Sequence, residues 1–302
     1  MAESRIAVYG AIAANVVIAA TKFTVAGITG SSAMMSEAIH SAVDTANDLL
    51  LLVGMARSEK PATAKHPFGH GKELYFWSLI VGVLIFGVGG GISFYEGVLH
   101  VRGDPQLADP FWNYIVLAFA AVFEAASFVV AWRQFSRERG DTPFWKALHA
   151  SKDPTTFTVV VEDAAALAGL AIAALGVYLS HLLQMPQLDG VASMLIGLLL
   201  AGVATILIRE SRGLLVGEGV RPDTASAIRE MLAQEPSVQE VGPVLSMYIG
   251  PDEALVIVEL RFAPQTPTTD AAQTIRSARE RIRERFPTLK RIYIDVPEEP
   301  AK

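Results

Sequence analysis

The chain has 302 residues, of which 51% are hydrophobic, and its formal net charge is -6. It contains no cysteine, which excludes disulfides, thiolate metal sites and redox-active thiols. Any metal site must therefore use His, Asp, Glu, backbone groups or water. Apolar residues concentrate in residues 1–212, whereas residues 213–302 are rich in Arg and Glu, as in a soluble domain. We expect no removable signal peptide before the first apolar run, which begins at Ile6.

Residues 1–212 contain six apolar runs, each close to the ~20 residues that a spanning helix needs. The runs cover approximately 6–27, 33–55, 76–99, 111–132, 157–181 and 190–208. They predict an all-α bundle of six transmembrane helices. The protein would then cross the lipid bilayer several times, as a multi-pass membrane protein.

The distribution of basic residues predicts the orientation of the bundle. The links after the first, third and fifth runs contain a single Lys or Arg, which is Arg102. The links after the second and fourth runs contain nine, namely Arg57, Lys60, Lys65, Lys72, Arg133, Arg137, Arg139, Lys146 and Lys152. By the positive-inside rule, both termini and the C-terminal domain are cytoplasmic.

In residues 213–302 the spacing of the apolar residues changes, and the new pattern predicts a small cytoplasmic α+β domain. A helix over 222–232 precedes strands over 241–249 and 254–262, a helix that opens at a capping box of Asp270 and Gln273, and a strand over 291–296. This order indicates a three-stranded sheet. At about 90 residues the domain buries only a modest core, so we expect contacts with another subunit. We find no nucleic-acid-binding motif and expect no nucleic-acid partner.

The second apolar run contains a ladder of ionisable residues, Glu37, His40, Asp44 and Asp48. Their spacing of three or four residues places them on one face of a helix. Ionisable groups are costly inside a bilayer, so they indicate a functional site. His40 and Asp44, one turn apart, can both bind a divalent metal. The alternative is that these groups only bond neighbouring helices.

Other polar residues in the apolar runs extend this hypothesis. In the fifth run, Asp163, or less readily its neighbour Glu162, can supply a third ligand, since adjacent residues point about 100° apart on a helix. Glu124 in the fourth run either takes part in ion movement or is a protonated hydrogen-bonding group. Lys22 in the first run is expected to snorkel to the outer surface, and Asn15 to bond a neighbouring helix.

The link after the second run contains a possible second metal site. His66 and His70 lie four residues apart around a glycine-rich turn, and two imidazoles so placed can share a divalent metal. The alternative is a tight loop whose histidines are solvated.

These motifs together resemble the cation diffusion facilitator family of divalent-metal transporters. The resemblance rests on Ser31-Ser32, on Glu37-Ala38-Ile39-His40-Ser41 with Asp44, and on residues 60–62 and 66–72, and it covers the whole chain. It implies proton-coupled export of Zn²⁺ or a similar ion from the cytosol by a secondary active transporter, not an enzyme, with no organic cofactor. It also implies a homodimer formed through a C-terminal domain with a metallochaperone-like (ferredoxin-like) fold, and a transport site of His40, Asp44 and Asp163. We expect a location in a bacterial inner (plasma) membrane.

Two departures from the family pattern concern metal binding. The family usually has His or Asp four residues before the fifth-helix Asp, where this chain has Val159. Glu162, Asp48, Asn47 or water can fill the missing position, while Glu37 and Glu124 are assigned to the ion or proton pathway. Residues 151–157 with Glu162-Asp163 resemble the subgroup that includes zinc transporter nine. Family members with a loop site often have Asp where this chain has Thr63, which weakens the His66/His70 hypothesis.

Several alternatives to zinc export stay open at this point. Mn²⁺, Fe²⁺, Co²⁺ and Ni²⁺ are possible cargoes, because ligand type alone does not choose among them. A non-transporting membrane sensor or scaffold is a second possibility, suggested by the missing fourth ligand. An intramembrane enzyme is disfavoured, since no nucleophile or cofactor motif lies near His40 and Asp44.

Overall fold

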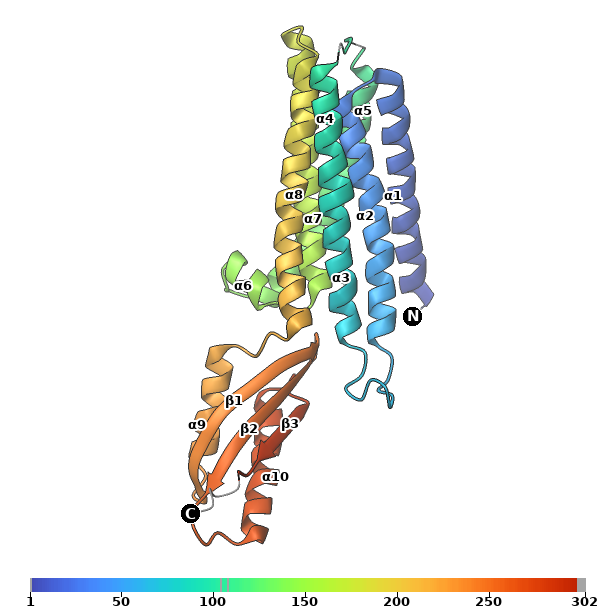
Figure 1. Cartoon of the computed structure of the whole chain (residues 1–302). Helices are drawn as coiled ribbons and strands as arrows, with labels where there is room; N and C mark the ends of the chain where they lie inside the picture. The colour runs from blue at the N-terminus through green and yellow to red at the C-terminus, as the bar shows by residue number, and fades with distance from the viewer. Residues whose placement is uncertain (1, 104, 108, 298–302) are drawn as a thin grey trace. The chain divides into compact units, whose positions relative to one another are not determined.

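A computed structural model of the chain describes residues 2–103, 105–107 and 109–297, with side chains described throughout these ranges except at 2–14, 138, 149, 150 and 156 (Figure 1). The chain folds into two compact units. The first comprises Met1–Met55 with Phe76–Ser211, and the second comprises Ala56–Tyr75 with Arg212–Lys302.

The first unit is a helical bundle. In chain order these are α1 (Ala2–Thr29), α2 (Ser32–Ser58), α3 (Lys72–Leu84), η1 (Ile85–Ile92), α4 (Ser93–Arg102), α5 (Phe111–Arg139), α6 (Phe144–Ala150), α7 (Pro154–Leu182) and α8 (Gln187–Val216). The segments α3, η1 and α4 form one continuous rod in which η1 is a π-helical stretch. At the start of α7, the Asp153 side chain accepts a hydrogen bond from the backbone N–H of Thr155, and Pro154 occupies the first turn.

Four helical stretches of the described residues are long and apolar enough to cross a membrane. They are Lys72–Arg102, Phe111–Arg137, Phe157–Leu182 and Gln187–Val216. These stretches contain the predicted third to sixth spans. The apolar part of α1 whose side chains the structure describes, Asn15–Thr29, is shorter. The helix α2 has the length but contains the ionisable ladder, so the first two spans stay predictions.

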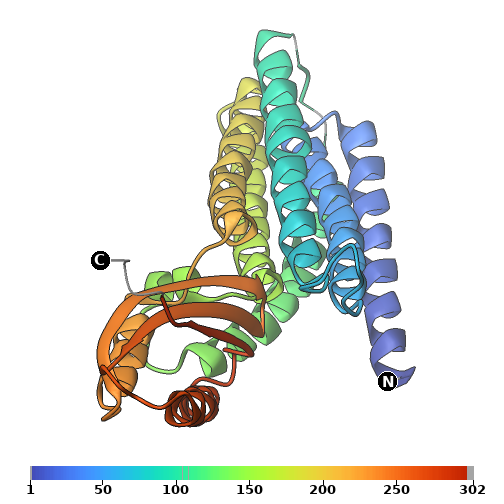
Figure 2. The ribbon, with the colours of Figure 1, turned by 60° about the horizontal axis from the view of Figure 1, so that its bottom comes forward.

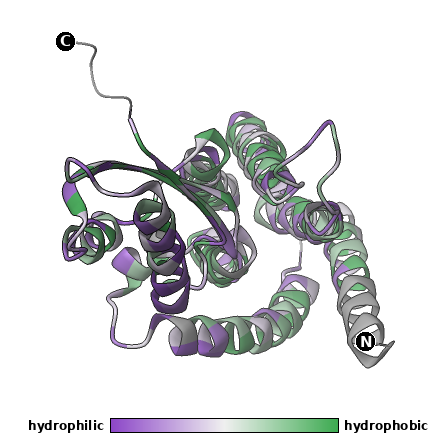
Figure 3. Cartoon of the chain, turned by 90° about the horizontal axis from the view of Figure 1, so that it is seen from below, coloured by the Kyte–Doolittle hydropathy of each residue, from purple (hydrophilic) through white to green (hydrophobic). Residues whose placement is uncertain are grey.

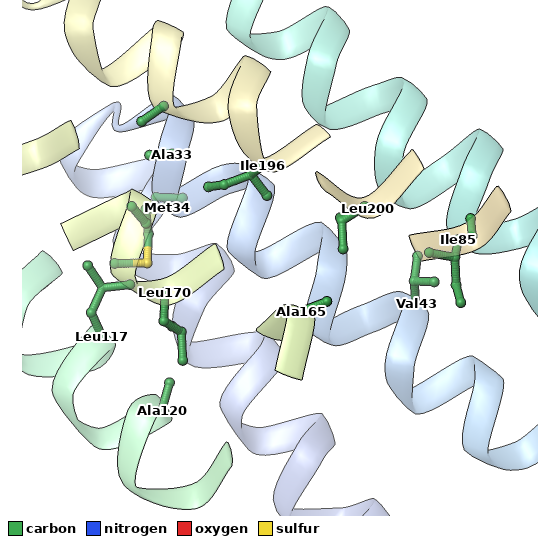
Figure 4. Packing of buried hydrophobic residues seen from close by; sticks show 14 of the residues in the cluster. Ala33, Met34, Val43, Ile85, Leu117, Ala120, Ala165, Leu170, Ile196 and Leu200 are labelled. Atoms are coloured by element: carbon green, nitrogen blue, oxygen red, sulfur yellow. The ribbon is translucent and has the colours of Figure 1, made fainter. Parts of the chain in front are cut away.

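Apolar side chains fill the interior of the bundle and also cover its outside. Figure 4 shows Met34 and Val43 of α2 within a core that includes Leu170 of α7 and Ile196 of α8. On α5, Phe119 and Val122 are 66% and 68% exposed. Figure 3 shows that hydrophobic colouring predominates along the helices of the bundle. This distribution suits helices whose outer faces contact lipid.

A seam of glycines joins η1 and α4 closely to α8. A Cβ atom at Gly197 would lie 2.6 Å from the backbone N of Phe94 and 2.7 Å from the carbonyl O of Gly90. A Cβ atom at Gly97 would lie 2.5 Å from the carbonyl O of Gly190. Small residues allow such backbone approach, which favours helix association within a membrane.

The start of α2 is tied to α8 by a carboxylate. Gly30, at φ +65°, makes the turn that ends α1. Asp189 of α8 accepts hydrogen bonds from the Ser31 hydroxyl (2.9 Å) and from the backbone N–H groups of Ser32 and Ala33. These N–H groups have no partner within the first turn of a helix, so Asp189 acts as a cap that comes from another helix.

The second unit contains the α+β fold that the sequence predicts. Its elements are α9 (Pro222–Ala233), β1 (Val238–Gly250), β2 (Glu253–Phe262), α10 (Thr268–Arg285) and β3 (Arg291–Asp295). In the described residues the sheet order is β1-β2-β3, antiparallel for the first pair and parallel for the second. Figure 2 shows the helices on one side of the sheet, where Ile228 and Ile282 pack against Val256 and Val258. The capping-box prediction was wrong: α10 begins earlier, at Thr268, with Pro267 as the N-cap residue, so Asp270 lies inside the first turn.

The loop between α2 and α3 belongs to this second unit. A Cβ atom at Gly71 would lie 2.3 Å from the carbonyl O of Ile249, so only glycine fits there. The guanidinium carbon of Arg291 lies 5.3 Å from the centre of the Phe68 ring. Lys72 Nζ donates to the carbonyl O of Leu215 at 3.3 Å. The second unit therefore combines this loop with the C-terminal α+β fold.

The glycine seam generates a stability prediction. Gly197→Ala should lower the thermal unfolding temperature of the detergent-solubilised protein, with a loss of roughly 1–3 kcal/mol, because its methyl group meets backbone atoms that cannot move aside cheaply. Gly202→Ala on the same helix is the matched control, since nothing lies within 4 Å of its Cβ position. It should leave stability equal or slightly higher, because Ala favours helix more than Gly does. Equal unfolding temperatures for the two variants would contradict the proposed seam.

Candidate metal-binding site in the helical bundle

The ionisable ladder lies along α2 as its spacing predicts. Glu37 and His40 are buried, with 0% and 2% exposure, and Asp44 is partly exposed. His40 Nδ1 lies 3.4 Å from Asp44 Oδ1. Within the described residues, neither ring nitrogen of His40 nor Oδ1 of Asp44 has a hydrogen-bond partner. A buried imidazole and a neighbouring carboxylate with unused lone pairs are suitable groups for a metal ion.

A cavity of about 330 Å³ lies beside this ladder, between α1, α2, α5 and α7. Five carboxyl-bearing residues line it, namely Asp44, Asp48, Glu124, Glu162 and Asp163. So many carboxylates around one cavity require cations or protons to balance their charge, because the surrounding bundle is apolar. The cavity therefore has the chemistry of a cation-binding chamber.

Neutral donors from neighbouring helices orient three of these carboxyl groups. Asn15 Nδ2 donates to Asp48 at 3.3 Å, which confirms the predicted bond to a neighbouring helix. Asn47 Nδ2 donates to Glu162 Oε1 at 2.9 Å. Such partners hold ligand oxygens in place and leave their second oxygen available.

Ser127 of α5 holds the third carboxyl group, that of Asp163. Its hydroxyl donates to Asp163 Oδ2 at 2.8 Å. Ser127 was not among the predicted residues, although its position one turn after Glu124 on the same helix face could have indicated it. Glu162 and Asp163 have different partners, as their 100° separation predicts, yet both line the cavity.

The structure places some of the predicted ligands around one cavity but not all of them. Asp44 and Asp163 line the same cavity, and Val159 lines it too. His40 is adjacent to the cavity through Ser41 and Asp44 but is not one of its lining residues. In the residues that the structure describes, no three His, Asp or Glu side chains are gathered closely enough to hold a metal. A single ion held by His40, Asp44 and Asp163 would therefore require these side chains to move closer together.

Two further predicted residues have different surroundings. Glu124 lines the cavity, as expected for a residue on an ion pathway. The prediction that Lys22 snorkels was wrong: it is 1% exposed and its ammonium lies 3.0 Å from Glu37 Oε2. The ion pair with a carboxylate on the adjacent helix stabilises the buried ammonium of Lys22. A lysine without such a partner would instead extend to the surface.

The loop histidines also lie together. The ring centres of His66 and His70 are 4.4 Å apart, and they tilt by 43°. Among the described residues, no third His, Asp or Glu joins them in a metal-holding group. A metal at this position stays a prediction.

A bundle of apolar helices around a carboxylate-lined cavity is typical of membrane proteins that carry cations. Residues 8–216 match the family described as the cation efflux transmembrane domain. The chain belongs to the cation diffusion facilitator family, whose members transport divalent cations.

Curated relatives differ in the metal that their names state. The proton-coupled zinc antiporter SLC30A9, mitochondrial, of Xenopus laevis is 35% identical over 237 residues, which are 78% of this chain and 42% of that protein. Metal tolerance protein C4 of Arabidopsis thaliana is 31% identical over 269 residues, 87% of this chain and 58% of the relative. The manganese efflux system protein MneP of Bacillus subtilis is 26% identical over 288 residues, 95% of this chain and 93% of the relative. The chain thus spans about two fifths of the length of the vertebrate relative.

The position of Val159 generates a prediction about metal affinity. Val159 lines the cavity one turn before Asp163, so Val159→His would add an imidazole beside that carboxylate. We expect Zn²⁺ to bind at least roughly tenfold more tightly, which corresponds to about 1.4 kcal/mol from the added ligand. Isothermal titration calorimetry of the detergent-solubilised protein measures this change.

Leu175→His is the matched control for this substitution. Leu175 lies on the same helix and is 56% exposed. An equal gain in affinity at both positions, or none at Val159, would show that residue 159 does not face the metal.

Proposed function

We propose that this protein exports a divalent metal cation, foremost Zn²⁺, from the cytoplasm in exchange for protons, as a secondary active transporter that works by alternating access. The observation that carries the proposal is that Asp44 of α2 and Asp163 of α7 line one cavity beside the buried imidazole of His40. Donors from two helices allow a relative movement of those helices to assemble and open the site.

The proposed ligands are His40, Asp44 and Asp163, with Glu162 or Asp48 as an additional oxygen donor. A metal ion must exchange its water shell for such ligands in order to enter the bundle. The same groups bind protons, so metal and protons compete for them. In the proposed cycle, cytoplasmic metal displaces protons, the helices move, and protons from the other side displace the metal. We assign Glu37 and Glu124 to the pathway along which ions or protons reach the site.

Mn²⁺ is the second candidate cargo. Its support is that carboxylates, and among the described residues no imidazole, line the cavity, and oxygen ligands suit Mn²⁺. A relative named as a manganese efflux protein matches nearly the whole chain. Fe²⁺, Co²⁺ and Ni²⁺ stay alternative cargoes.

The remaining features of the proposal concern topology and location. We propose six spans with both termini cytoplasmic, because the basic residues concentrate in the links after the second and fourth runs. A bacterial inner membrane stays a prediction, and the name of the vertebrate relative places that protein in mitochondria.

A homodimer through the C-terminal domain is part of the proposal. Leu245, Ile257 and Tyr293 are paired across the three strands, and they are 59%, 37% and 48% exposed. The neighbouring residues Val256 and Val258 point to the opposite face and are fully buried. An apolar row across an open sheet face suits burial against a second copy of the same row.

Transport is tested in proteoliposomes with an imposed pH gradient and an internal metal indicator. Zn²⁺ uptake should depend on the gradient, and Asp44→Ala or Asp163→Ala should lower its rate by at least about 100-fold, because each removes a charged ligand. Glu230→Ala in α9, an exposed residue, is the control and should transport like the parent. Uptake of Mn²⁺ in place of Zn²⁺ would favour the second candidate.

Parental rates in both Asp variants would contradict the site assignment. An absence of any gradient-driven metal flux in the parent would instead favour a sensor or scaffold.

The dimer is tested by the oligomeric state of the full chain in detergent. Ile257→Glu should shift the protein from dimer to monomer in size-exclusion chromatography with light scattering, because the new charge would be buried at the interface. Ala272→Glu adds the same charge on α10, at an exposed position, and should leave the dimer intact. A dimer in both variants would exclude the sheet face as the contact.

A further inference from the structure

A further hollow of the bundle lies between α1 and α5. Its volume is about 470 Å³, which exceeds that of the cation cavity. Among the described residues, every side chain that lines it is apolar except that of Thr21. The Thr21 hydroxyl already donates to the carbonyl O of Val17 at 2.7 Å. Because water occupies a cavity only where polar groups can bind it, this hollow is unsuited to water.

The hollow is a groove that follows both helices. On α1 its lining extends from Val17 to Ile28, and on α5 it extends from Trp112 to Phe123. Each stretch is about 17 Å long at the helical rise of 1.5 Å per residue. One leaflet contributes half of the hydrocarbon core of a bilayer, which is about 15 Å. The groove therefore has the length of one acyl chain of one leaflet.

The groove is open to the surroundings of the bundle. Val17, Ile28 and Phe119 belong to its lining and are exposed. It is continuous with the outer face of α5, where Val122 is exposed as well. Trp112 lies at one end of the groove, and tryptophan favours the membrane–water interface. An acyl chain can therefore enter from the side, with its head group beside Trp112.

The groove and the cation cavity share a wall. Ile18 of α1 and Phe123 of α5 line both hollows. These two apolar side chains therefore separate the groove from the carboxyl groups of the cavity. A molecule packed in the groove would support this wall, because the lining atoms of an empty groove lack contacts on one side.

We propose that the groove between α1 and α5 binds one acyl chain of a membrane phospholipid, and that this chain forms the lipid side of the cavity wall. Acyl chains are the medium around the outer face of α5. A chain that enters the groove stays in apolar surroundings and gains close contacts with the lining side chains. The inference depends on the helical bundle lying in a bilayer, and it does not depend on the transported metal.

Two threonines on α1 provide a matched test. Thr21 lines the groove and Thr24 does not, while both are exposed and donate to the carbonyl O four residues earlier. Thr21→Trp should fill the groove with its indole and weaken binding of 1-palmitoyl-2-oleoyl phosphatidylethanolamine by at least roughly tenfold. Thr24→Trp should bind this lipid like the parent. Native mass spectrometry of the full-length, detergent-solubilised protein, with the lipid titrated, measures the bound lipid.

The dependence on acyl-chain length is a second measurement, which the parent provides without either variant. Affinity should rise as the acyl chains lengthen and should level off once a chain spans the groove. No bound lipid, or an affinity that does not change with chain length, would overturn the proposal.

The variants can also contradict the proposal. Equal lipid binding by Thr21→Trp and Thr24→Trp would show that the lipid does not occupy the groove. A second copy of the protein is the other possible occupant. If light scattering shows that Thr21→Trp loses its dimer while lipid binding is unchanged, the groove is a contact between subunits and the proposal is wrong.

Discussion

A charged side chain inside a membrane-spanning bundle needs a partner close by, because little water is available to solvate it. The arrangement around α2 follows from this constraint. Lys22 balances Glu37 in full burial, and neutral amides or hydroxyls each hold one carboxyl group of the cavity. The carboxyl oxygens that stay without such partners are the groups that protons or metal ions can satisfy.

The two sides of the bundle differ in how closely their helices pack. The helices η1 and α4 approach α8 through glycines that leave no room for a side chain. The helices α1, α2, α5 and α7 instead surround a polar cavity. A tight seam resists relative movement, whereas helices around a cavity can rearrange with fewer lost contacts. This difference supports the proposed transport cycle, in which α2 and α7 move relative to each other around the metal.

Val159 shows how this chain departs from its family while keeping the cavity. It lies on the cavity wall where a metal ligand is usual, and carboxyl groups from three helices, α2, α5 and α7, line the same cavity. Among the described residues, the cavity is therefore lined by several acidic groups and by no imidazole. Carboxylates discriminate less sharply among divalent metals than thiolates or imidazoles do, so cargo choice depends on how these oxygens converge.

The sequence by itself determined the class of protein, the helices of the bundle, the order of elements in the C-terminal domain and the ladder on α2. These features are local, because they depend on apolar run length, on helical or strand periodicity and on motifs within a few residues. Only the tertiary structure decided the partners of the polar groups. Lys22 is buried because Glu37 faces it from another helix, and Asp189 caps α2 from 157 residues away. Such pairings depend on which helices become neighbours, and spacing along a single helix does not contain that information.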